Sequence, residues 1–420
     1  MKSKPGAHGA PVVRLRCGGV PTLLCHNPAH EVVALRLYVR GGSSSLASRH
    51  AGADALHARV ARRGTRHYPK EKLNADLARM GTEIGGAASE DWSSYRLRCV
   101  RRHFESSWQI LADVVLHPLL ADDELELVRR QMLAEIRQRH DDPDGRLDDL
   151  GRELTYEGHP YAAHPGGTEE SVRDLSVELL RTHAESQLTR GNLLLVVAGD
   201  VGRDALEPLV ESTLGRLPEG NGAAQLPPPL RFAASRLHVE ARELPTNYVL
   251  GQFPAPALDA DAYAATLLAM SVLRDRLFEE VRTKRNLSYA PAAGLGSHAA
   301  NVAWIYVTAV DTRQTMRVML DEMKRMRDVP LEEKELRDKV QVYITRYYLQ
   351  NETNQAQVGF LGRYELLGNG WERSRDFVSR LEALTPDDVQ QAARAVLQNI
   401  QYAYLGDPEL AHSDLFVDPA

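Results

Sequence analysis

The chain has 420 residues, enough for two or more domains at the usual ~100 to 200 residues per domain. Hydrophobic residues make up 43% of it and charged residues 26%, which is typical of a globular protein. The formal net charge of -6 offers no basic excess for nucleic acid or for an anionic membrane surface. We therefore expect neither of them as a partner.

The cysteines and the hydropathy pattern indicate a compartment. Cys17, Cys25 and Cys99 form an odd set without paired spacing, which argues against a disulfide framework and for reducing conditions. The first residues include basic side chains but not the apolar segment of a secretion signal. No run approaches the ~18 apolar residues that cross a membrane. We therefore expect a cytoplasmic protein without a membrane span.

In chain order, the first part of the sequence predicts alternating helices and strands. A glycine entry and a Gly-Thr exit frame a helix over 52–65. Alternating apolar residues predict a strand at 92–100, and an amphipathic helix follows at 105–115. Another helix is predicted over 174–186, and the apolar run 192–200 predicts a strand that ends in Gly-Asp.

The second part of the sequence repeats this order. A strand is predicted at 302–310, an amphipathic helix at 313–323, and a second helix at 383–396. The last helix has a threonine cap followed by proline at its first position. The strand at 400–407 again ends in Gly-Asp.

Three pairs of matching positions show that the order is a tandem repeat. Offsets that agree within four residues are hard to obtain by chance, so the chain consists of two similar halves. The pairs are Tyr95 and Tyr306, Leu175 and Leu384, and Gly199 and Gly406, at offsets of 211, 209 and 207 residues.

The segment 216–235 is rich in proline and glycine and is predicted to be a linker. Its triple proline favours a stiff polyproline conformation that holds the halves apart. The halves are then 1–215 and 236–420. Each mixes strands with helices, which predicts an α+β fold with helices packed on an antiparallel sheet. The acidic segment 141–150 is expected to be solvated.

Several segments together carry a family resemblance: VALRLYVRGGS (33–43), GADALHARVARRGT (52–65), LARMGTEIGGAASEDWSSYRL (77–97), VRRQMLAEIRQRHDDPD (128–144), RLFEEVRTKRNLSYA (276–290) and LTPDDVQQAARAV (384–396). With them the chain resembles, from Val32 to its end, the bacterial M16B metallopeptidases of the insulinase-like (pitrilysin) clan and the subunits of the mitochondrial processing peptidase. The resemblance implies two α+β halves that enclose a peptide chamber, within the chain or with a partner.

The zinc motif of that family is degenerate here. In HxxEH, two histidines at i and i+4 bind the metal, a glutamate activates water, and a glutamate from a later helix completes the ligands. Ala55 and Arg59 occupy the histidine positions and Ala58 the glutamate position. Only Glu135 matches the distant ligand, and His57 lies off the ligand face. The resemblance therefore implies that this chain binds no zinc.

Arg59 is predicted to take the place of the metal. A guanidinium ~4 Å from Zn²⁺ would be repelled by roughly 8 kcal/mol at an effective dielectric constant of ~20. We expect an ion pair between Arg59 and a buried carboxylate of Glu135. The alternative is that Arg59 points into chamber solvent.

The second half keeps two residues of the family pattern. Arg282 and Tyr289, seven residues apart, match the arginine and tyrosine that the family supplies from its C-terminal half. The resemblance implies that they reach across the chamber to the scissile peptide and stabilise its carbonyl, each contributing on the order of 3 kcal/mol. Taken singly, such an arginine is more often a surface ion-pair residue, and such a tyrosine a core residue.

The edge strand that follows the zinc helix also differs from the family. In the family, an asparagine-alanine pair on this strand binds extended substrate by strand addition. This sequence has Gly85 and Gly86 at that place. Glycines leave the backbone donors available but weaken strand order and remove side-chain contacts. We therefore expect weaker substrate binding by this half.

These features imply a catalytically incomplete subunit of a heterodimeric zinc metallopeptidase. The chain would hold no cofactor itself. A partner would supply HxxEH and zinc, and peptides or unfolded polypeptides would be the substrates. Two alternatives are a structural relative, like the core subunits of a respiratory complex, and a peptide-binding escort protein. Retention of Arg282 and Tyr289 favours the peptidase subunit over the structural relative.

Overall fold

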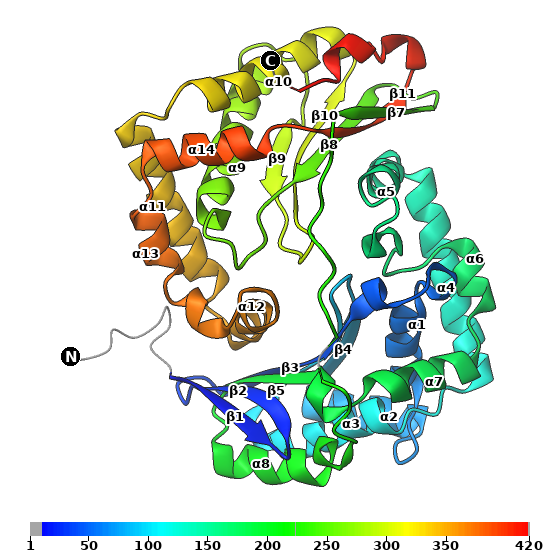
Figure 1. The fold of residues 1–420 in the computed structure, drawn as a ribbon. Helices are drawn as coiled ribbons and strands as arrows, with labels where there is room; N and C mark the ends of the chain where they lie inside the picture. Colours follow the sequence, from blue (N-terminus) through cyan, green and yellow to red (C-terminus); the bar gives the residue numbers. More distant parts are fainter. Residues whose placement is uncertain (1–10, 223, 419–420) are drawn as a thin grey trace.

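Two β-sheets organise the fold, one in each half of the chain (Figure 1). The computed structural model describes residues 11–222 and 224–418. The first sheet has the order β1-β2-β6-β3-β5-β4, and the second has the order β7-β11-β8-β10-β9. The strands are β1 (Val12–Cys17), β2 (Val20–His26), β3 (Val32–Arg40), β4 (Glu83–Ala88), β5 (Trp92–Val100), β6 (Leu193–Gly199), β7 (Arg236–Ala241), β8 (Asn247–Pro254), β9 (Ala292–Leu295), β10 (Val302–Ala309) and β11 (Gln401–Gly406).

The two sheets share one topology, which confirms the predicted repeat. After β1, the strands β2-β6-β3-β5-β4 correspond in position to β7-β11-β8-β10-β9. Tyr95 and Tyr306 lie on the equivalent strands β5 and β10, and Gly199 and Gly406 end β6 and β11. The α+β class is confirmed, with one departure from the expected antiparallel arrangement. β2 pairs with β6 in parallel, as β7 does with β11, because each is reached through a long crossover.

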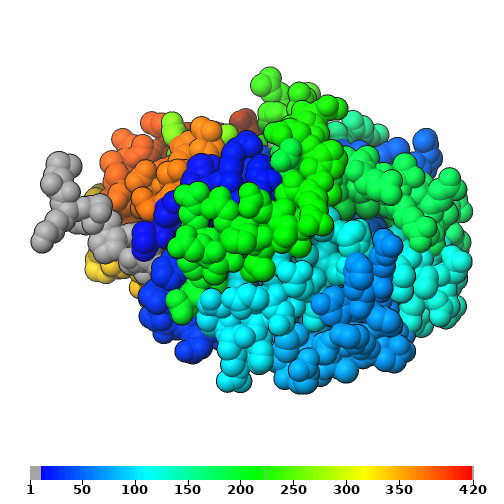
Figure 2. All heavy atoms as spheres, turned by 90° about the horizontal axis from the view of Figure 1, so that it is seen from below, coloured from blue at the N-terminus to red at the C-terminus, as the bar shows by residue number. Residues whose placement is uncertain are grey.

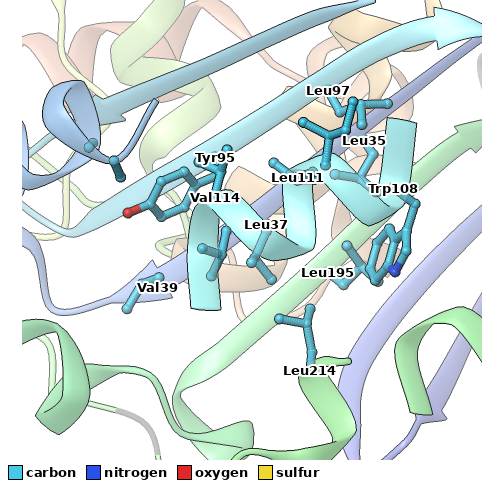
Figure 3. Close-up of a cluster of buried hydrophobic side chains, with 14 of the residues drawn as sticks. Leu35, Leu37, Val39, Tyr95, Leu97, Trp108, Leu111, Val114, Leu195 and Leu214 are labelled. Carbon is cyan, nitrogen blue, oxygen red and sulfur yellow. The ribbon is translucent and has the colours of Figure 1, made fainter. Parts of the chain in front are cut away.

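Helices cover the outer face of the first sheet. The side chains of β3 alternate across the sheet, so Leu35, Leu37 and Val39 meet this helical layer (Figure 3). Trp108 is fully buried there, and its indole N–H donates to the Leu209 carbonyl at 3.2 Å. Figure 2 shows α8, α3 and α2 side by side on this face. The helices are α1 (Ala53–Val60), α2 (Lys70–Met80), α3 (Phe104–Leu116), α4 (Asp122–Asp141), α5 (Pro143–Thr155), α6 (Glu169–Asp174), α7 (Val177–Gln187) and α8 (Arg203–Ser212).

The second sheet is covered in the same way. Methionines of α10 and the apolar residues of α9 fill the core beneath β8 and β10. In residues 11–222 and 224–418, none of the helices combines the length and apolarity needed to span a bilayer. The helices of this half are α9 (Tyr263–Leu277), α10 (Thr312–Asp328), α11 (Glu333–Gln350), α12 (Asn354–Leu367), α13 (Phe377–Glu382) and α14 (Pro386–Val396).

Each half places one helix on the inner face of the other half's sheet. α5 of the first half packs on β8 and β11, and α12 of the second half packs on β2, β3 and β6 (Figure 1). Pro143 and Asn354, which open these helices, are 211 residues apart, so the exchange follows the repeat. Both sheets are thereby buried on two faces, which explains why β6 is apolar throughout.

This exchange corrects two expectations. The linker does not hold the halves apart, because α5 and α12 bring the halves into direct contact. The Pro228 carbonyl instead accepts a hydrogen bond from His159 at 2.9 Å, so the linker runs along the first half. The acidic segment 141–150 is not merely solvated either. It opens α5, and the hydroxyl of Tyr306 in the other half donates to Asp144 at 2.6 Å.

The contact of α12 with β3 yields a stability prediction. Gly362 lies against the ring of Tyr38, which is fully buried, so a methyl group at 362 overlaps the ring. Gly362→Ala should lower the free energy of unfolding by about 1 to 3 kcal/mol through overpacking, although alanine is the better helix former. Urea denaturation followed by circular dichroism measures the change.

Gly359 in the same helix is the matched control. An added methyl group there meets its nearest neighbour, an Arg36 nitrogen, at 3.8 Å. Gly359→Ala should therefore be neutral or stabilising by about 0.5 to 1 kcal/mol. Equal effects of the two substitutions would contradict the proposed packing.

Candidate functional site

The degenerate metal-binding helix is α1, and its position follows from the glycine before it. Gly52 caps the helix with φ 89°, and a Cβ there would lie 3.0 Å from the Cα of Gly167. Both facts require glycine. α1 runs over Ala53–Val60 and continues as a short 3-10 turn, Ala61–Arg63, so the helix predicted over 52–65 is confirmed. The helix lies against β4 and α4.

Arg59 and Glu135 form the ion pair that the sequence predicted. Nη1 of Arg59 lies 2.9 Å from Oε1 and 2.8 Å from Oε2 of the Glu135 carboxylate on α4. The prediction that the carboxylate is buried was wrong, because the Glu135 side chain is 56% exposed. Water therefore screens the pair, and it contributes little to stability.

The remaining motif positions carry no metal donor. Ala58 is 2% exposed, and a Cβ on Gly86 of β4 would lie 2.9 Å from the Cβ of Ala58. Ala58 is therefore packed closely against this strand. Ala55 is half-buried. His57 is turned into the core, where its Nδ1 lies 3.0 Å from the hydroxyl oxygen of Tyr95.

Burial also keeps His57 uncharged. Removal from water lowers the pKa of His57 to about 4, because the protonated imidazole loses its solvation. The nearby carboxylate of Asp54, which acts in the opposite direction, does not compensate for this effect. His57 is therefore a neutral core residue that hydrogen-bonds a tyrosine.

Arg282 and Tyr289 meet at the end of α9. The helix continues into a π-helical turn, Phe278–Thr283, a form that often marks functional positions. The Arg282 guanidinium carbon lies 3.9 Å from the ring centroid of Tyr289 and 4.8 Å from that of Phe278. These distances permit cation–π attraction to both rings.

The loop after the π-helical turn folds Tyr289 back onto Arg282. Asn286 adopts a left-handed conformation with φ 52°, and its N–H donates to the Arg282 carbonyl at 3.1 Å. The Leu287 N–H donates to the Val281 carbonyl at 2.9 Å. Even so, the Tyr289 side chain remains 77% exposed.

The structure brings Arg59 to Glu135 and Arg282 to Tyr289, but it does not join the two sites. Within the described residues, no hydrogen bond or ion pair links the segment 278–289 to the first half. Gly85 and Gly86 lie on β4, the edge strand of the first sheet, as predicted. They adjoin α1 and belong to the first of the two sites.

Comparison with protein-family models decides the family. The model described as "Insulinase (Peptidase family M16)" matches residues 22–169. The model described as "Peptidase M16 inactive domain" matches residues 174–343. The chain belongs to peptidase family M16.

M16 relatives match along both halves. An uncharacterized zinc protease of Mycobacterium leprae is 24% identical over 409 residues, covering 94% of this chain and 91% of the relative. Subunit 1 of the mitochondrial cytochrome b-c1 complex of Mus musculus is 21% identical over 296 residues, covering 64% of this chain and 61% of the relative. The crystal structure of a peptidase M16 inactive domain from Pseudomonas fluorescens matches with a TM-score of 0.86 at 21% identity, covering 94% of this chain and 98% of that one. This likeness shows a shared fold.

Relatives in M16 are named zinc proteases, but the residues at the motif positions of this chain do not fit a zinc ion. Two of the four motif positions are alanines, a third is the guanidinium of Arg59, and that guanidinium already binds Glu135. Across the part of the chain that the structure describes, no group of three His, Cys, Asp or Glu side chains is placed to hold a metal ion. The motif positions of this chain therefore do not form a zinc site.

The sequence interpretation missed one residue that contacts Arg282. Phe278 is 44% exposed and forms the second aromatic wall around Arg282. The available signal was its spacing four residues before Arg282, which places two helical side chains on one face. It also missed the basic residues that follow Arg59 in RVARRGTRHYPK, although the run is visible in the sequence.

The exposure of the Arg59–Glu135 pair predicts a small energetic role. Arg59→Ala should lower the free energy of unfolding by less than about 1 kcal/mol, as exposed ion pairs do. Urea denaturation of this variant and of Glu135→Gln should give similar small losses. A loss of several kcal/mol for either would contradict the exposed geometry.

The neutral His57 predicts a pH dependence. An unfolded histidine binds its proton near pH 6.5, whereas folded His57 stays neutral to about pH 4, so stability falls as pH falls through this range. His57 alone contributes a slope of up to about 1.4 kcal/mol per pH unit. His57→Gln, which keeps a partner for Tyr95, should reduce the slope measured by urea denaturation between pH 7 and 4.5. An unchanged slope would show that His57 takes up its proton in the folded state.

Proposed function

We propose that this chain is the zinc-free subunit of a heteromeric M16B metallopeptidase. Arg282 and Tyr289 would contact a peptide bound at the metal site of a partner chain that carries HxxEH. Zinc belongs to that partner, and the substrates are peptides or unfolded polypeptide segments. The observation that carries the proposal is the Arg282–Tyr289 stack, which is preformed and open to solvent.

The stack suits hydrogen-bond donation to a substrate carbonyl. Two aromatic rings hold the Arg282 guanidinium at 3.9 and 4.8 Å, which limits its motion. In the described residues it forms no ion pair with a carboxylate, so its N–H groups and positive charge stay available. Preorganised donors of this kind stabilise the negative charge that develops on the carbonyl oxygen during hydrolysis.

The exposure of the stack supports a requirement for a second chain. Phe278 and Tyr289, which both contact Arg282, are exposed aromatic residues, and exposed apolar surface of this kind commonly marks sites that a partner or ligand covers. Where metal binding and water activation are needed, the first half of this chain provides Ala55, Ala58 and Arg59, and its one carboxylate there, Glu135, is paired with Arg59. We therefore assign hydrolysis of the substrate's peptide bond to the metal site of the partner.

Reconstitution tests the proposal. The chain, an HxxEH-bearing M16 chain from the same organism, and their mixture are each assayed for bound zinc and for cleavage of a quenched fluorescent peptide. Activity is expected only in the mixture. Arg282→Ala and Tyr289→Phe should each reduce kcat/KM by roughly 100-fold, the usual loss of one oxyanion donor.

Arg285→Ala is the matched control, because Arg285 is an exposed arginine of the same segment that pairs with Glu280 instead. It should keep the activity of the mixture. Full activity of the partner alone would refute the proposal. Association without any effect of the Arg282 and Tyr289 variants would favour a purely structural subunit, the role that the similarity to the cytochrome b-c1 subunit suggests.

A further inference from the structure

A pocket of about 770 Å³ lies among β3, α9, α11 and α12, where the two halves of the chain meet. This volume is within the range of pockets that hold small ligands. Arginines and aromatic side chains line the pocket together, and none of the lining residues is acidic. The chain as a whole is acidic, with a formal net charge of -6, so this lining is unusual for its surface.

Four arginines line the pocket, and each comes from a different element. They are Arg36 on β3, Arg274 on α9, Arg346 on α11 and Arg363 on α12. Arg36 points from β3 toward α12, since its Nη1 would lie 3.8 Å from a Cβ on Gly359. Gly359 and Arg363 are four residues apart and therefore lie on the same side of α12. The positive charges of Arg36 and Arg363 thus converge from the two halves.

Three of the four guanidiniums lack a carboxylate partner in the part of the chain that the structure describes. Among the four, only Arg274 is paired, at 3.1 Å from Asp275. Nε of Arg36 is buried, and none of the described residues offers it a hydrogen-bond acceptor. Arg346 and Arg363 are exposed and form no ion pair with those residues. An anion in the pocket would supply the missing acceptor and the missing negative charge.

The remaining wall of the pocket is largely aromatic. Tyr347 stacks on Phe377 with ring centroids 5.4 Å apart, and it meets Phe360 edge-on at 5.3 Å. Phe360 in turn lies 4.8 Å from Tyr364, its neighbour on the next turn of α12. These are the distances of favourable aromatic pairs, so the rings form one contiguous surface.

The cationic and aromatic walls adjoin each other. Arg363 follows Phe360 by three residues on α12, and Arg346 follows Tyr343 by three residues on α11, so each arginine lies beside a ring. Burial raises the pKa of Tyr263 to about 12, and the positive charge of Arg363 acts in the opposite direction, which places Arg363 near that ring as well. A ligand with a flat apolar body and an anionic group would contact both walls at once.

We propose that this pocket binds a small aromatic anion, a planar ring that bears a carboxylate or a phosphate group. The ring lies against the aromatic wall at Phe360, and the anionic group contacts Arg36 and Arg363, while Arg346 adds to the positive potential. Arginine suits either group, because its fork of N–H donors matches two oxygens. The bound anion links the first half to the second. Binding requires neither zinc nor a partner chain, and Arg282 and Tyr289 do not line the pocket.

Isothermal titration calorimetry with the purified full chain tests the proposal. The probes are naphthoate, naphthyl phosphate, the neutral naphthalenemethanol, the saturated decalin carboxylate and inorganic phosphate. At least one naphthyl anion should bind roughly tenfold more tightly than the neutral, saturated and ring-free probes, a difference of about 1.4 kcal/mol. The tighter of the two identifies the anionic group. Binding should weaken as salt increases.

Arg363→Gln and Arg346→Gln change exposed side chains, so both variants should fold, and Arg363→Gln should weaken binding of the naphthyl anion at least roughly tenfold. Arg346→Gln should have a smaller effect in the same direction. Arg317→Gln is the matched control, because Arg317 is an exposed arginine of the same half, on α10, that does not line the pocket. Equal binding of naphthalenemethanol and the naphthyl anions would overturn the proposal. So would equal binding of decalin carboxylate, or affinities that Arg363→Gln leaves unchanged.

Discussion

The reciprocal packing of α5 and α12 is the constraint on which the rest of the molecule depends. Each helix covers the inner face of the sheet that belongs to the other half, so neither sheet is complete without the other half. Burial on both faces accounts for the continuous apolar strands and removes the need for a spacer between the halves. It also places one helix of each half between the two sheets. The Arg282–Tyr289 stack is not part of these helix–sheet contacts, and Tyr289 is exposed to solvent.

Local signals in the sequence predicted much of the fold. Apolar runs located the strands β5, β6, β10 and β11, and Thr385 caps α14 as expected. The sequence did not predict which distant segments pack or pair with each other. Amphipathicity shows that α5 has an apolar face but not which sheet it meets, and strand sequences do not reveal that β2 and β6 run in parallel. These features depend on contacts between segments more than 100 residues apart.

The candidate sites also have features that the sequence predicted and features that it did not. The family pattern placed Glu135 opposite Arg59 because both positions are fixed by the helices α1 and α4. It could not predict that the carboxylate is exposed, since exposure depends on what lies above the pair. The spacing of Phe278 four residues before Arg282 is visible in the sequence, but the π-helical turn that carries both residues is not. A pocket lined by Arg59, Arg62, Arg63, Lys70, Asn74, Gly86 and Gln131 combines α1, the turn after it, α2, β4 and α4, so only the folded chain assembles it.

The two sites differ in how their arginines are held, and this difference determines where positive charge is available. Glu135 neutralises Arg59, so that guanidinium offers little to an incoming anion. Backbone carbonyls hold Arg62, and aromatic rings hold Arg282. Both environments fix orientation without supplying a negative charge. The charge of Arg59 is therefore neutralised within the chain, whereas Arg62 and Arg282 have no carboxylate partner among the described residues.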